Sequence, residues 1–262
     1  PQNTVDTCGT GGDMKDTLNI STSAAIVAAS AGIKIAKHGN RSVSSKCGSA
    51  DMLEDMGFKI TSDTNELENS LTNQNFCFLF AQNHHSAMKN VINVRKNLGT
   101  RTIFNLLGPL TNPANAKIQL LGVYSKELVS MHCNCLKELG SERALVVHGL
   151  DGLDEISLSD KTLINELKDN KINEFVFDPK DYGYDYIKIE EIKGGNPDFN
   201  SYAFLDMING NNEPYQNIVA INAGAAIYLS GKAKNLKEGF KIAHKVLDEG
   251  ITKDFVYSVT NG

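Results

Sequence analysis

Tryptophan is missing from this chain of 262 residues, and aromatic residues make up only 7% of it. Basic residues are also few, because 26 Lys and Arg stand against 31 Asp and Glu and leave a formal net charge of −5. A protein that binds nucleic acid usually carries a broad basic face with exposed aromatic side chains. We therefore expect no nucleic-acid partner.

Long apolar runs and paired cysteines are also lacking. The most apolar stretch, residues 24–36, is interrupted by Ser30 and Lys34 and is shorter than the roughly 20 residues of a membrane helix. The start shows no signal-peptide pattern. The five cysteines are an odd number without a CxxC pair, which argues against a disulfide framework or a zinc site. We expect a cytoplasmic protein that does not bind a membrane.

Asp and Glu are absent from two long windows, residues 17–50 and 69–126. Four basic residues lie in the first window and six in the second, whereas the chain from residue 127 onward holds 14 Lys and Arg against 22 Asp and Glu. Net charge does not determine a fold, but the local sign of charge indicates the kind of ligand. The two windows are therefore expected to bind an anion.

Strand-like and helix-like patterns alternate along the chain, which is long enough for a substantial core. Strands are expected at residues 4–8, 33–36, 76–80, 118–124, 144–147, 174–177 and 186–189. Helices are expected at 21–31, 52–56, 65–71, 85–98, 127–139, 202–208, 218–229 and 236–247. This order predicts an α/β fold with a mainly parallel central sheet flanked by helices. One domain is the simplest organisation.

Glycines and short polar residues follow the first expected strand. The segment Gly9-Thr10-Gly11-Gly12-Asp13 could be a tight turn or could point backbone N–H groups at a ligand. It is neither a Walker A loop nor the GxGxxG dinucleotide fingerprint. Asn19, Ser21 and Thr22 then gather at the expected start of a helix, where Ser21 or Thr22 can cap it. Such side chains can also hold a phosphate or ligate Mg²⁺.

A second cluster, Lys37 to Ser45, combines two cations, Asn40 and three serines without any acidic residue. This composition favours an anion site over an ordinary surface loop. His38 is as consistent with a structural role as with a catalytic one. Elsewhere, Asp154-Glu155 fits either a solvated acidic turn or a site for metal ions shared with substrate phosphates. Arg95 fits either a surface position or a clamp for a carboxylate.

Five motifs occur in an order that resembles the anthranilate phosphoribosyltransferase family, which belongs to the nucleoside phosphorylase-like fold group. They are Asp6 to Asp13, Asn19 to Thr22, Lys37 to Ser45 with Gly48-Ser49, Arg101 to Pro113, and Asp154-Glu155. The likeness continues through Asn222 to Ala226 and covers essentially the whole chain.

The resemblance implies transfer of phosphoribosyl from 5-phosphoribosyl 1-pyrophosphate to the amine of anthranilate, with Mg²⁺ and in tryptophan biosynthesis. It implies a large α/β domain, here 1–262, plus a small helical domain to which 84–112 contributes, usually in a homodimer. The implied metal ligands are Ser21, Asp154 and Glu155, and Lys37, His38 and Arg95 are candidates for positioning, with no certain catalytic residue. Substrate contacts are implied for Gly9, Gly12, Asp13, Thr17, Asn19, Ser21, Thr22, Lys37, Asn40, Arg41, Ser42, Ser44, Ser45, Ser49 and Arg95. Asn40 and Arg95 among them match anthranilate-binding residues.

Two departures from the family pattern qualify these expectations. Ser86 follows His85 where the family commonly has Pro, which removes a fixed φ on the acceptor side. Family members also begin with helices upstream of the glycine loop, and the printed chain does not contain them. We expect a fragment that is a weaker dimer or a monomer. A nucleoside phosphorylase remains the rival enzyme, although Asp154-Glu155 and the pair Asn40 and Arg95 argue against it.

Overall fold

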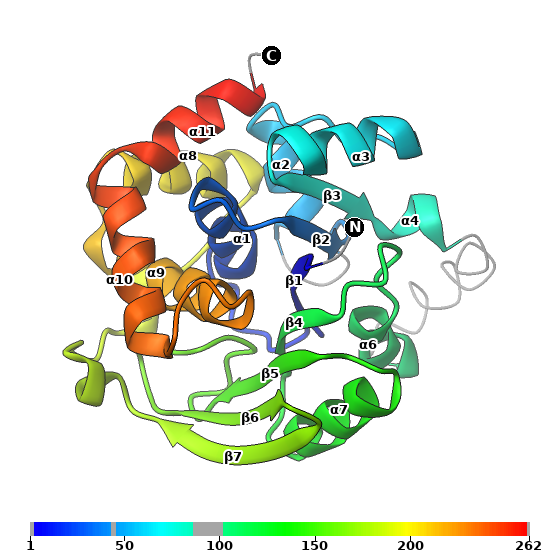
Figure 1. Cartoon of the computed structure of the whole chain (residues 1–262). Helices are drawn as coiled ribbons and strands as arrows, with labels where there is room; N and C mark the ends of the chain where they lie inside the picture. Colours follow the sequence, from blue (N-terminus) through cyan, green and yellow to red (C-terminus); the bar gives the residue numbers. More distant parts are fainter. Residues whose placement is uncertain (1–2, 43–45, 86–101, 261–262) are drawn as a thin grey trace.

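The computed structural model describes residues 3–42, 46–85 and 102–260, and its centre is a seven-stranded sheet (Figure 1). The strand order is β3-β2-β1-β4-β5-β6-β7. The strands are β1 Val5–Gly9, β2 Ile35–Gly39, β3 Phe76–Phe80, β4 Ile118–Gly122, β5 Arg143–Gly149, β6 Thr162–Lys168 and β7 Lys171–Phe177. All ladders from β3 to β5 are parallel, whereas β6 and β7 pair antiparallel. The prediction of a mainly parallel sheet is confirmed.

The antiparallel edge is the part of the sheet that the sequence patterns misplaced. No strand was expected at β6, and the strand expected at 186–189 is wrong, since Ile189–Ile192 forms a 3-10 helix instead. Asp169 and Asn170 both have positive φ, 51° and 58°, in the two-residue turn between β6 and β7. Such a turn joins adjacent antiparallel strands and is the signal that could have revealed this hairpin.

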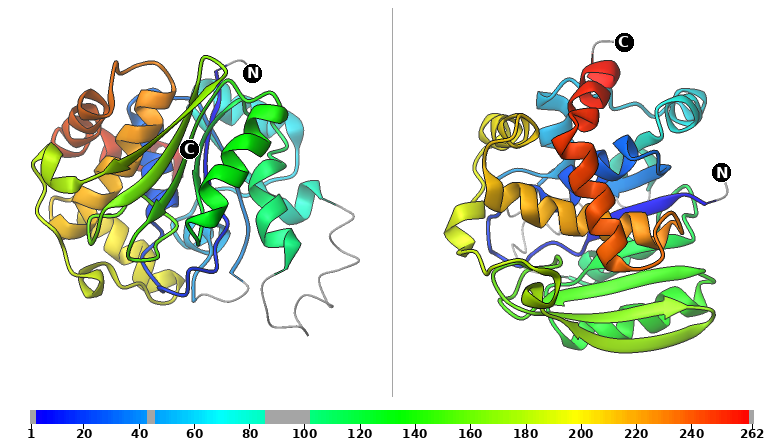
Figure 2. Two further views of the ribbon diagram at one scale, coloured as in Figure 1. Left: turned by 90° about the horizontal axis from the view of Figure 1, so that it is seen from below. Right: turned by 60° about the vertical axis from the view of Figure 1, so that its left-hand side comes forward.

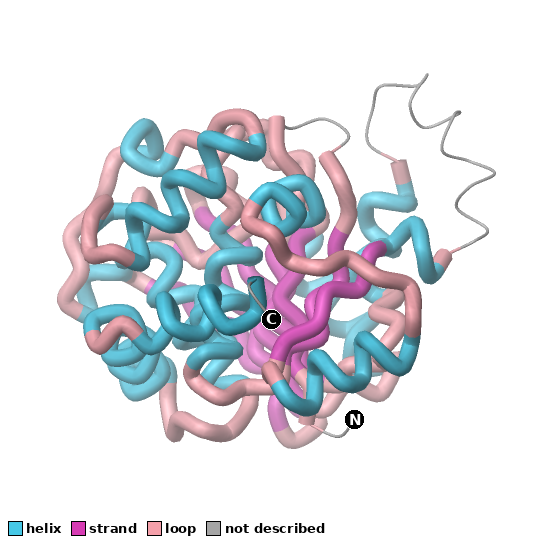
Figure 3. The backbone as a smooth tube through the Cα atoms, turned by 90° about the horizontal axis from the view of Figure 1, so that it is seen from above, coloured by secondary structure: helices cyan, strands magenta, loops and turns pink. Residues whose placement is uncertain are grey.

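Helices cover both faces of the sheet (Figures 2 and 3). One face carries α1 Ile20–Ser30, α2 Ser49–Asp55, α8 Pro197–Ile208, α9 Glu213–Leu229, α10 Leu236–Asp248 and α11 Ile251–Thr260. The other carries α3 Thr64–Asn73 and α7 Glu127–Glu138. Short helices α4 Ala81–His84, α6 Ile103–Leu107 and η2 Gly108–Leu110 lie before β4, and η3 Pro179–Tyr182 follows β7. Within the described ranges no helix is long and apolar enough to cross a membrane.

Strand side chains alternate between the two cores, as a two-sided sheet requires. In β5, Leu145 and Val147 pack in the large core with α1 and α9, while Ala144 and Val146 pack against α7. The left panel of Figure 2 shows this layering, with the sheet between the orange helices and the green α7. The helix expected at 85–98 lies outside the described residues except for His85, so the small helical domain expected from 84–112 stays a prediction.

The chain changes direction across the sheet at β1. It runs from β1 to β2 and β3 on one side, and then returns to place β4 and β5 on the other side. In open α/β sheets, ligands bind beyond the carboxyl ends of the strands at this reversal of strand order. A ligand site is therefore expected at the carboxyl ends of β1 and β4.

Candidate functional site

Two glycines end the adjacent strands β1 and β4, and Asp154 lies directly over them. Gly9 pairs in register with Gly122. A Cβ on Gly9 would lie 2.6 Å from Asp154 Oδ2, and a Cβ on Gly122 would lie 1.5 Å from the backbone oxygen of Asp154. Gly122 thus needs glycine because the backbone of Asp154 crosses it, whereas at Gly9 the neighbouring group is the Asp154 carboxylate. Gly122 was not among the predicted site residues, because its place beside the glycine loop follows from the pairing of β1 with β4.

The two adjacent carboxylates face different partners. Asp154 Oδ2 accepts a hydrogen bond from the N–H of Gly11 at 2.9 Å, and Glu155 Oε1 accepts one from the N–H of Ser21 at 3.1 Å. Gly11 belongs to the glycine loop and Ser21 to the first turn of α1. The acidic turn is therefore part of the site and connects both predicted phosphate-binding motifs.

These carboxyl groups are buried and crowd one another. Burial, followed by the neighbouring Asp13, raises the pKa of Asp154 to about 7. Burial and Asp154 together raise the pKa of Glu155 well above its usual range, and burial raises the pKa of Asp13 as well. A cation placed among them would favour their charged forms.

The donor set suits Mg²⁺, which takes oxygen ligands and usually one or two protein carboxylates together with substrate phosphates. Among residues 3–42, 46–85 and 102–260, no three His, Cys, Asp or Glu side chains are already grouped around a common metal position. Asp154 and Glu155 would thus supply part of a coordination shell, and phosphate oxygens would complete it.

Lys37 is the buried cation of the site. Strands β1 and β2 pair only at Val5 and Ile35, and they separate toward the site. The Lys37 Nζ donates to the backbone oxygen of Thr7 and lies 3.4 Å from Ser21 Oγ. The side chain is 1% exposed, and burial lowers its pKa. The Lys37 Nζ therefore lies next to the first turn of α1, which is one of the predicted phosphate-binding motifs.

His38 lies beside Lys37 but differs from it in charge. Its Nε2 is 3.2 Å from His85 Nε2, and its backbone N–H donates to Asp6 Oδ1 at 3.0 Å. Burial, with His85 and His84 next in effect, lowers the pKa of His38 to about 4. The imidazole is thus neutral at pH 7 and cannot serve as a cation for phosphate.

The start of α1 is built differently from the expectation. The helix begins at Ile20 with Asn19 as N-cap, and no side chain caps it, so the predicted capping by Ser21 or Thr22 is wrong. Asn19 Nδ2 instead donates to the Cys47 carbonyl at 3.2 Å, and its Oδ1 accepts from Asn200 Nδ2 at 2.7 Å. In the first turn the Ser21 N–H donates to Glu155, whereas the N–H groups of Ile20 and Ser23 donate to the carbonyls of Leu18 and Asn19.

The glycine loop itself turns through left-handed conformations, with φ of 62° at Gly11 and 79° at Gly12. Asp13 accepts a hydrogen bond from the Lys15 N–H at 3.1 Å, and Thr17 forms an isolated antiparallel bridge with Lys193. Thr22 is buried at 1% exposure. The loop thus returns to α1 along Lys193, a contact that no sequence motif indicated.

The cluster from Lys37 to Ser49 is only partly directed at the site. The Arg41 Nη1 lies 3.0 Å from Asp51 and 2.6 Å from Glu54, both in α2. The N–H groups of Ser42 and Gly48 also donate to Asp51, at 3.0 and 2.9 Å. Residues 17–50 contain no acidic residue, but in the folded chain Asp51 and Glu54 contact this segment.

Other members of the predicted set have mixed placements. Asn40 Oδ1 accepts from the Arg41 N–H at 2.8 Å and from Gln82 at 3.3 Å. Ser49 begins α2, with its Oγ next to Gly39 at the end of β2. Ser44, Ser45 and Arg95 lie outside the described residues, as does Ser86, so their roles remain predictions.

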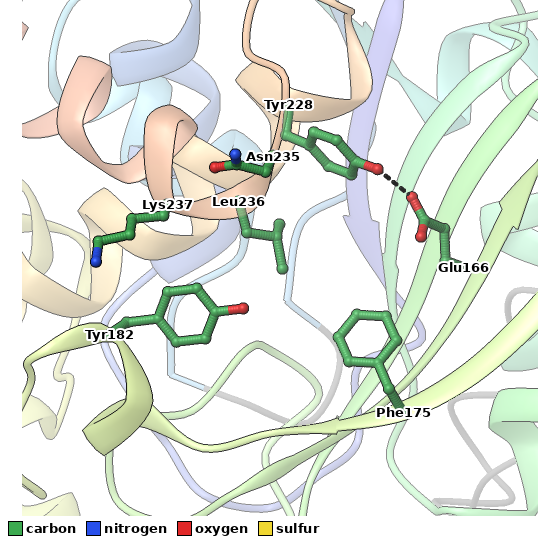
Figure 4. Close-up of a pocket in the computed structure, with 7 residues that line it drawn as sticks. All are labelled: Glu166, Phe175, Tyr182, Tyr228, Asn235, Leu236 and Lys237. Atoms are coloured by element: carbon green, nitrogen blue, oxygen red, sulfur yellow. Dashed lines mark hydrogen bonds between the residues drawn. The ribbon is translucent and has the colours of Figure 1, made fainter.

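A separate cavity of about 370 Å³ contains none of these residues (Figure 4). Its walls come from β6, β7, η3, α9 and α10, and Glu166 in it accepts a hydrogen bond from the Tyr228 hydroxyl. The lining residues are Glu166, Phe175, Tyr182, Tyr228, Asn235, Leu236 and Lys237. The predicted chemistry is concentrated at the strand ends and not in this cavity.

Comparison with known proteins agrees with the geometry. Residues 1–253 match the model of the glycosyl transferase family, a/b domain. The anthranilate phosphoribosyltransferase of Thermoanaerobacter sp. (strain X514) is 49% identical over 250 residues, which cover 95% of this chain and 74% of that protein. The enzyme of Methanobrevibacter smithii is 49% identical over 245 residues, covering 94% and 73%.

Solved structures show the same likeness. The crystal structure of the enzyme from Thermus thermophilus has a TM-score of 0.93 at 39% identity, covering all of this chain and 78% of that one. The enzyme from Saccharomyces cerevisiae in complex with PRPP and Mg has a TM-score of 0.87 at 30% identity, covering 100% and 74%. Sequence and fold thus agree, and the chain belongs to the anthranilate phosphoribosyltransferase family.

Proposed function

We propose that this chain transfers the phosphoribosyl group from 5-phosphoribosyl 1-pyrophosphate to the amine of anthranilate, in tryptophan biosynthesis, with Mg²⁺. The observation that carries the proposal is the position of Asp154 and Glu155. They lie at the ends of β1 and β4, with the glycine loop on one side and the first turn of α1 on the other. Few ligands other than a metal-bound diphosphate suit buried carboxylates next to backbone N–H donors and a lysine.

The donor side comprises residues of the two phosphate motifs. Backbone N–H groups of the glycine loop and of α1 favour negative charge, and the Lys37 Nζ, 3.4 Å from Ser21 Oγ, adds a further donor beside them. We assign contacts with the phosphoribosyl donor to Gly9, Gly12, Asp13, Thr17, Asn19, Ser21, Thr22, Lys37, Ser42, Ser44, Ser45 and Ser49. Arg41 can join them only if its guanidinium leaves Asp51 and Glu54.

Asp154 and Glu155, with the Ser21 hydroxyl, would hold Mg²⁺. When bound, Mg²⁺ neutralises charge on the diphosphate and makes pyrophosphate a better leaving group. The carboxylates keep the diphosphate at a fixed distance from the strand ends, while the α1 N–H groups and Lys37 stabilise the negative charge that develops on it.

The reaction itself needs little proton transfer. The carbon–oxygen bond to pyrophosphate breaks and the amine nitrogen of anthranilate forms a bond to the same anomeric carbon, through an oxocarbenium-like transition state. The nitrogen then releases one proton to water or to the departing pyrophosphate. The anthranilate amine is neutral at pH 7, so no strong base is required. Positioning therefore supplies much of the rate, and Asn40 and Arg95 are proposed to orient anthranilate.

Product analysis tests this function against its rival. Incubation with 5-phosphoribosyl 1-pyrophosphate, anthranilate and Mg²⁺ should give N-(5-phosphoribosyl)anthranilate and pyrophosphate in equal amounts by mass spectrometry. A nucleoside phosphorylase would instead use inorganic phosphate to release the free base from a nucleoside. The second result without the first would contradict the proposal.

Assembly and location complete the proposal. We propose a cytoplasmic enzyme, in keeping with five cysteines that are all free thiols. We also propose that it forms a homodimer, as expected for members of its family. Sedimentation velocity at micromolar protein measures the association, and a monomer would contradict that expectation.

A further inference from the structure

The helix α9 contains a polar residue at its most buried part. Asn222 lies in mid-helix with 0% of its surface exposed, between Ile221 and Ala223. Asparagine is a poor helix former and is costly to bury unless its amide is hydrogen-bonded. Its place in this helix therefore calls for a specific partner.

That partner is the backbone immediately after the two carboxylates. The Ile156 N–H donates to Asn222 Oδ1 at 3.0 Å, and Asn222 Nδ2 donates to the Ile156 carbonyl at 2.9 Å. Nδ2 also donates to the Ile218 carbonyl at 2.9 Å, one turn back in α9. One side chain thus satisfies both backbone groups of Ile156, as a neighbouring strand would.

The helix α9 also contacts α1, which carries the N–H donor to Glu155. Tyr215, at the start of α9, has its hydroxyl 2.6 Å from Ser23 Oγ in α1. The N–H of Ser21, two residues earlier in α1, is the donor to Glu155. The helix α9 therefore fixes both the segment that carries the carboxylates and the helix turn that one of them meets.

We infer that Asn222 is a positioning residue, which holds the backbone at Ile156 so that Asp154 and Glu155 are aimed at the metal-bound diphosphate. This inference rests on the proposed function, since it needs these two carboxylates to be the metal ligands. Residues behind metal ligands set ligand orientation, and their loss commonly weakens metal affinity about 10- to 100-fold.

Two substitutions test the role at different severity. Asn222→Leu keeps the branched heavy-atom skeleton, with two larger methyl groups in place of the amide oxygen and nitrogen, and leaves both backbone groups of Ile156 without a partner. Asn222→Ser is smaller and retains a hydroxyl, so it folds more readily. The control is Asn165→Leu, which removes another buried amide, 3% exposed, on β6. In the described part of the chain the Asn165 Oδ1 has no hydrogen-bond partner, so this change costs little.

The primary readout is calorimetric titration of Mg²⁺ into protein with inorganic pyrophosphate, which does not depend on turnover. We expect Asn222→Leu to weaken Mg²⁺ affinity at least about tenfold, Asn222→Ser to weaken it less, and Asn165→Leu to match the wild type. In the transfer assay, the Mg²⁺ concentration for half-maximal rate should rise in the same order. The KM for anthranilate at saturating Mg²⁺ should stay within about twofold, since the carboxylates do not face the acceptor.

The outcomes separate this inference from the function on which it rests. Unchanged Mg²⁺ affinity in a folded Asn222→Ser or Asn222→Leu protein, beside normal binding by the wild type, overturns the role of Asn222 alone. Absence of Mg²⁺ and pyrophosphate binding by the wild type overturns the proposed function and this inference with it. A change in melting temperature without a change in affinity would mark Asn222 as structural and would also overturn the inference.

Discussion

At the scale of single residues, the site requires glycines as well as residues with polar side chains. Gly9 and Gly122 carry no chemistry, yet Asp154 occupies the space that their side chains would take. The glycine-loop motif predicted Gly9, Gly12 and Asp13 as site residues. For Asp154-Glu155, the residues alone left a solvated acidic turn and a metal site as alternatives. Gly122 could not be singled out, because its need for glycine arises from a segment 32 residues later in the chain.

Replacing Gly122 tests this packing. In Gly122→Ala the new Cβ would lie 1.5 Å from the Asp154 backbone oxygen, so the acidic segment must move. A displacement of about 1 Å in a catalytic site can cost roughly 100-fold in rate. We expect kcat/KM to fall by about that factor, measured by steady-state kinetics at saturating Mg²⁺.

The matched control for Gly122 is Gly210→Ala, in the loop before α9. Gly210 has φ of 90° with nothing within 4 Å of the added Cβ. This change should cost about 1 kcal/mol of stability through backbone strain alone. Its kinetics should match the wild type, and equal kinetic losses in both variants would show that general destabilisation, and not contact with Asp154, is responsible.

His38 provides a prediction in pH. Its pKa is lowered to about 4 from an ordinary value near 6.5, so folding favours the neutral imidazole. The stability that this contributes is present above about pH 6.5 and is lost as pH falls through about 4, up to about 3 kcal/mol in all. Urea unfolding of wild type and His38→Gln at pH 7.5 and pH 4 should therefore show a stability difference that shrinks by up to that amount. Parallel pH profiles would contradict the lowered pKa.

Arg41 shows why charge alone did not locate every contact. The sequence placed it in an acid-free window and among the substrate-binding residues, but Asp51 and Glu54 lie just beyond that window, within 3.0 Å of its guanidinium in space. The turn through Gly48 brings α2 back against Arg41, since a Cβ there would lie 2.3 Å from the Ser42 nitrogen. Such a turn is a tertiary feature that composition does not reveal.

At the scale of elements, periodicity located most helices and parallel strands, because apolar spacing records which face is buried. The strand at Phe76–Phe80 and the helix from Glu127 were placed within a residue or less of the structure. In the hairpin, β7 was predicted only from Glu174 onward, since it is exposed along most of its length and shows little apolar pattern, and β6 was not predicted. The C-terminal helix Ile251–Thr260 was missed as well.

The packing of α1 against α9 supplies a prediction about stability. The Tyr215 hydroxyl contacts Ser23 Oγ, and both residues are 0% exposed. Tyr215→Phe removes one partner and leaves the buried serine hydroxyl without it, at a cost of about 1–2 kcal/mol. Urea unfolding measures this loss, and the slope of the transition should not change.

Tyr202→Phe on α8 is the control for that measurement, because Tyr202 is 68% exposed. It should alter the free energy of unfolding by less than about 0.5 kcal/mol. If Tyr215→Phe is equally silent, the hydroxyl pair does not contribute to joining the two helices.

At the scale of the whole molecule, the site is a consequence of strand order. The reversal at β1 brings the glycine loop, the start of α1 and the segment after β5 to one edge of the sheet. The acidic half of the chain contributes Asp154 and Glu155 to this edge, and a cation there would favour their charged forms. The sequence could predict that these motifs act together, but only the topology shows that Asp154 and Glu155 lie between the two phosphate motifs.

The central claim is that these two carboxylates hold the Mg²⁺ on which phosphoribosyl transfer depends. The most direct measurement follows the loss of anthranilate fluorescence with 5-phosphoribosyl 1-pyrophosphate over a range of Mg²⁺ concentrations. Wild type is compared with the doubly substituted Asp154→Asn, Glu155→Gln protein. We expect wild-type transfer to require Mg²⁺, and the variant to lose most activity and to need far more Mg²⁺ for what remains. A variant with the same Mg²⁺ dependence as the wild type would contradict the account.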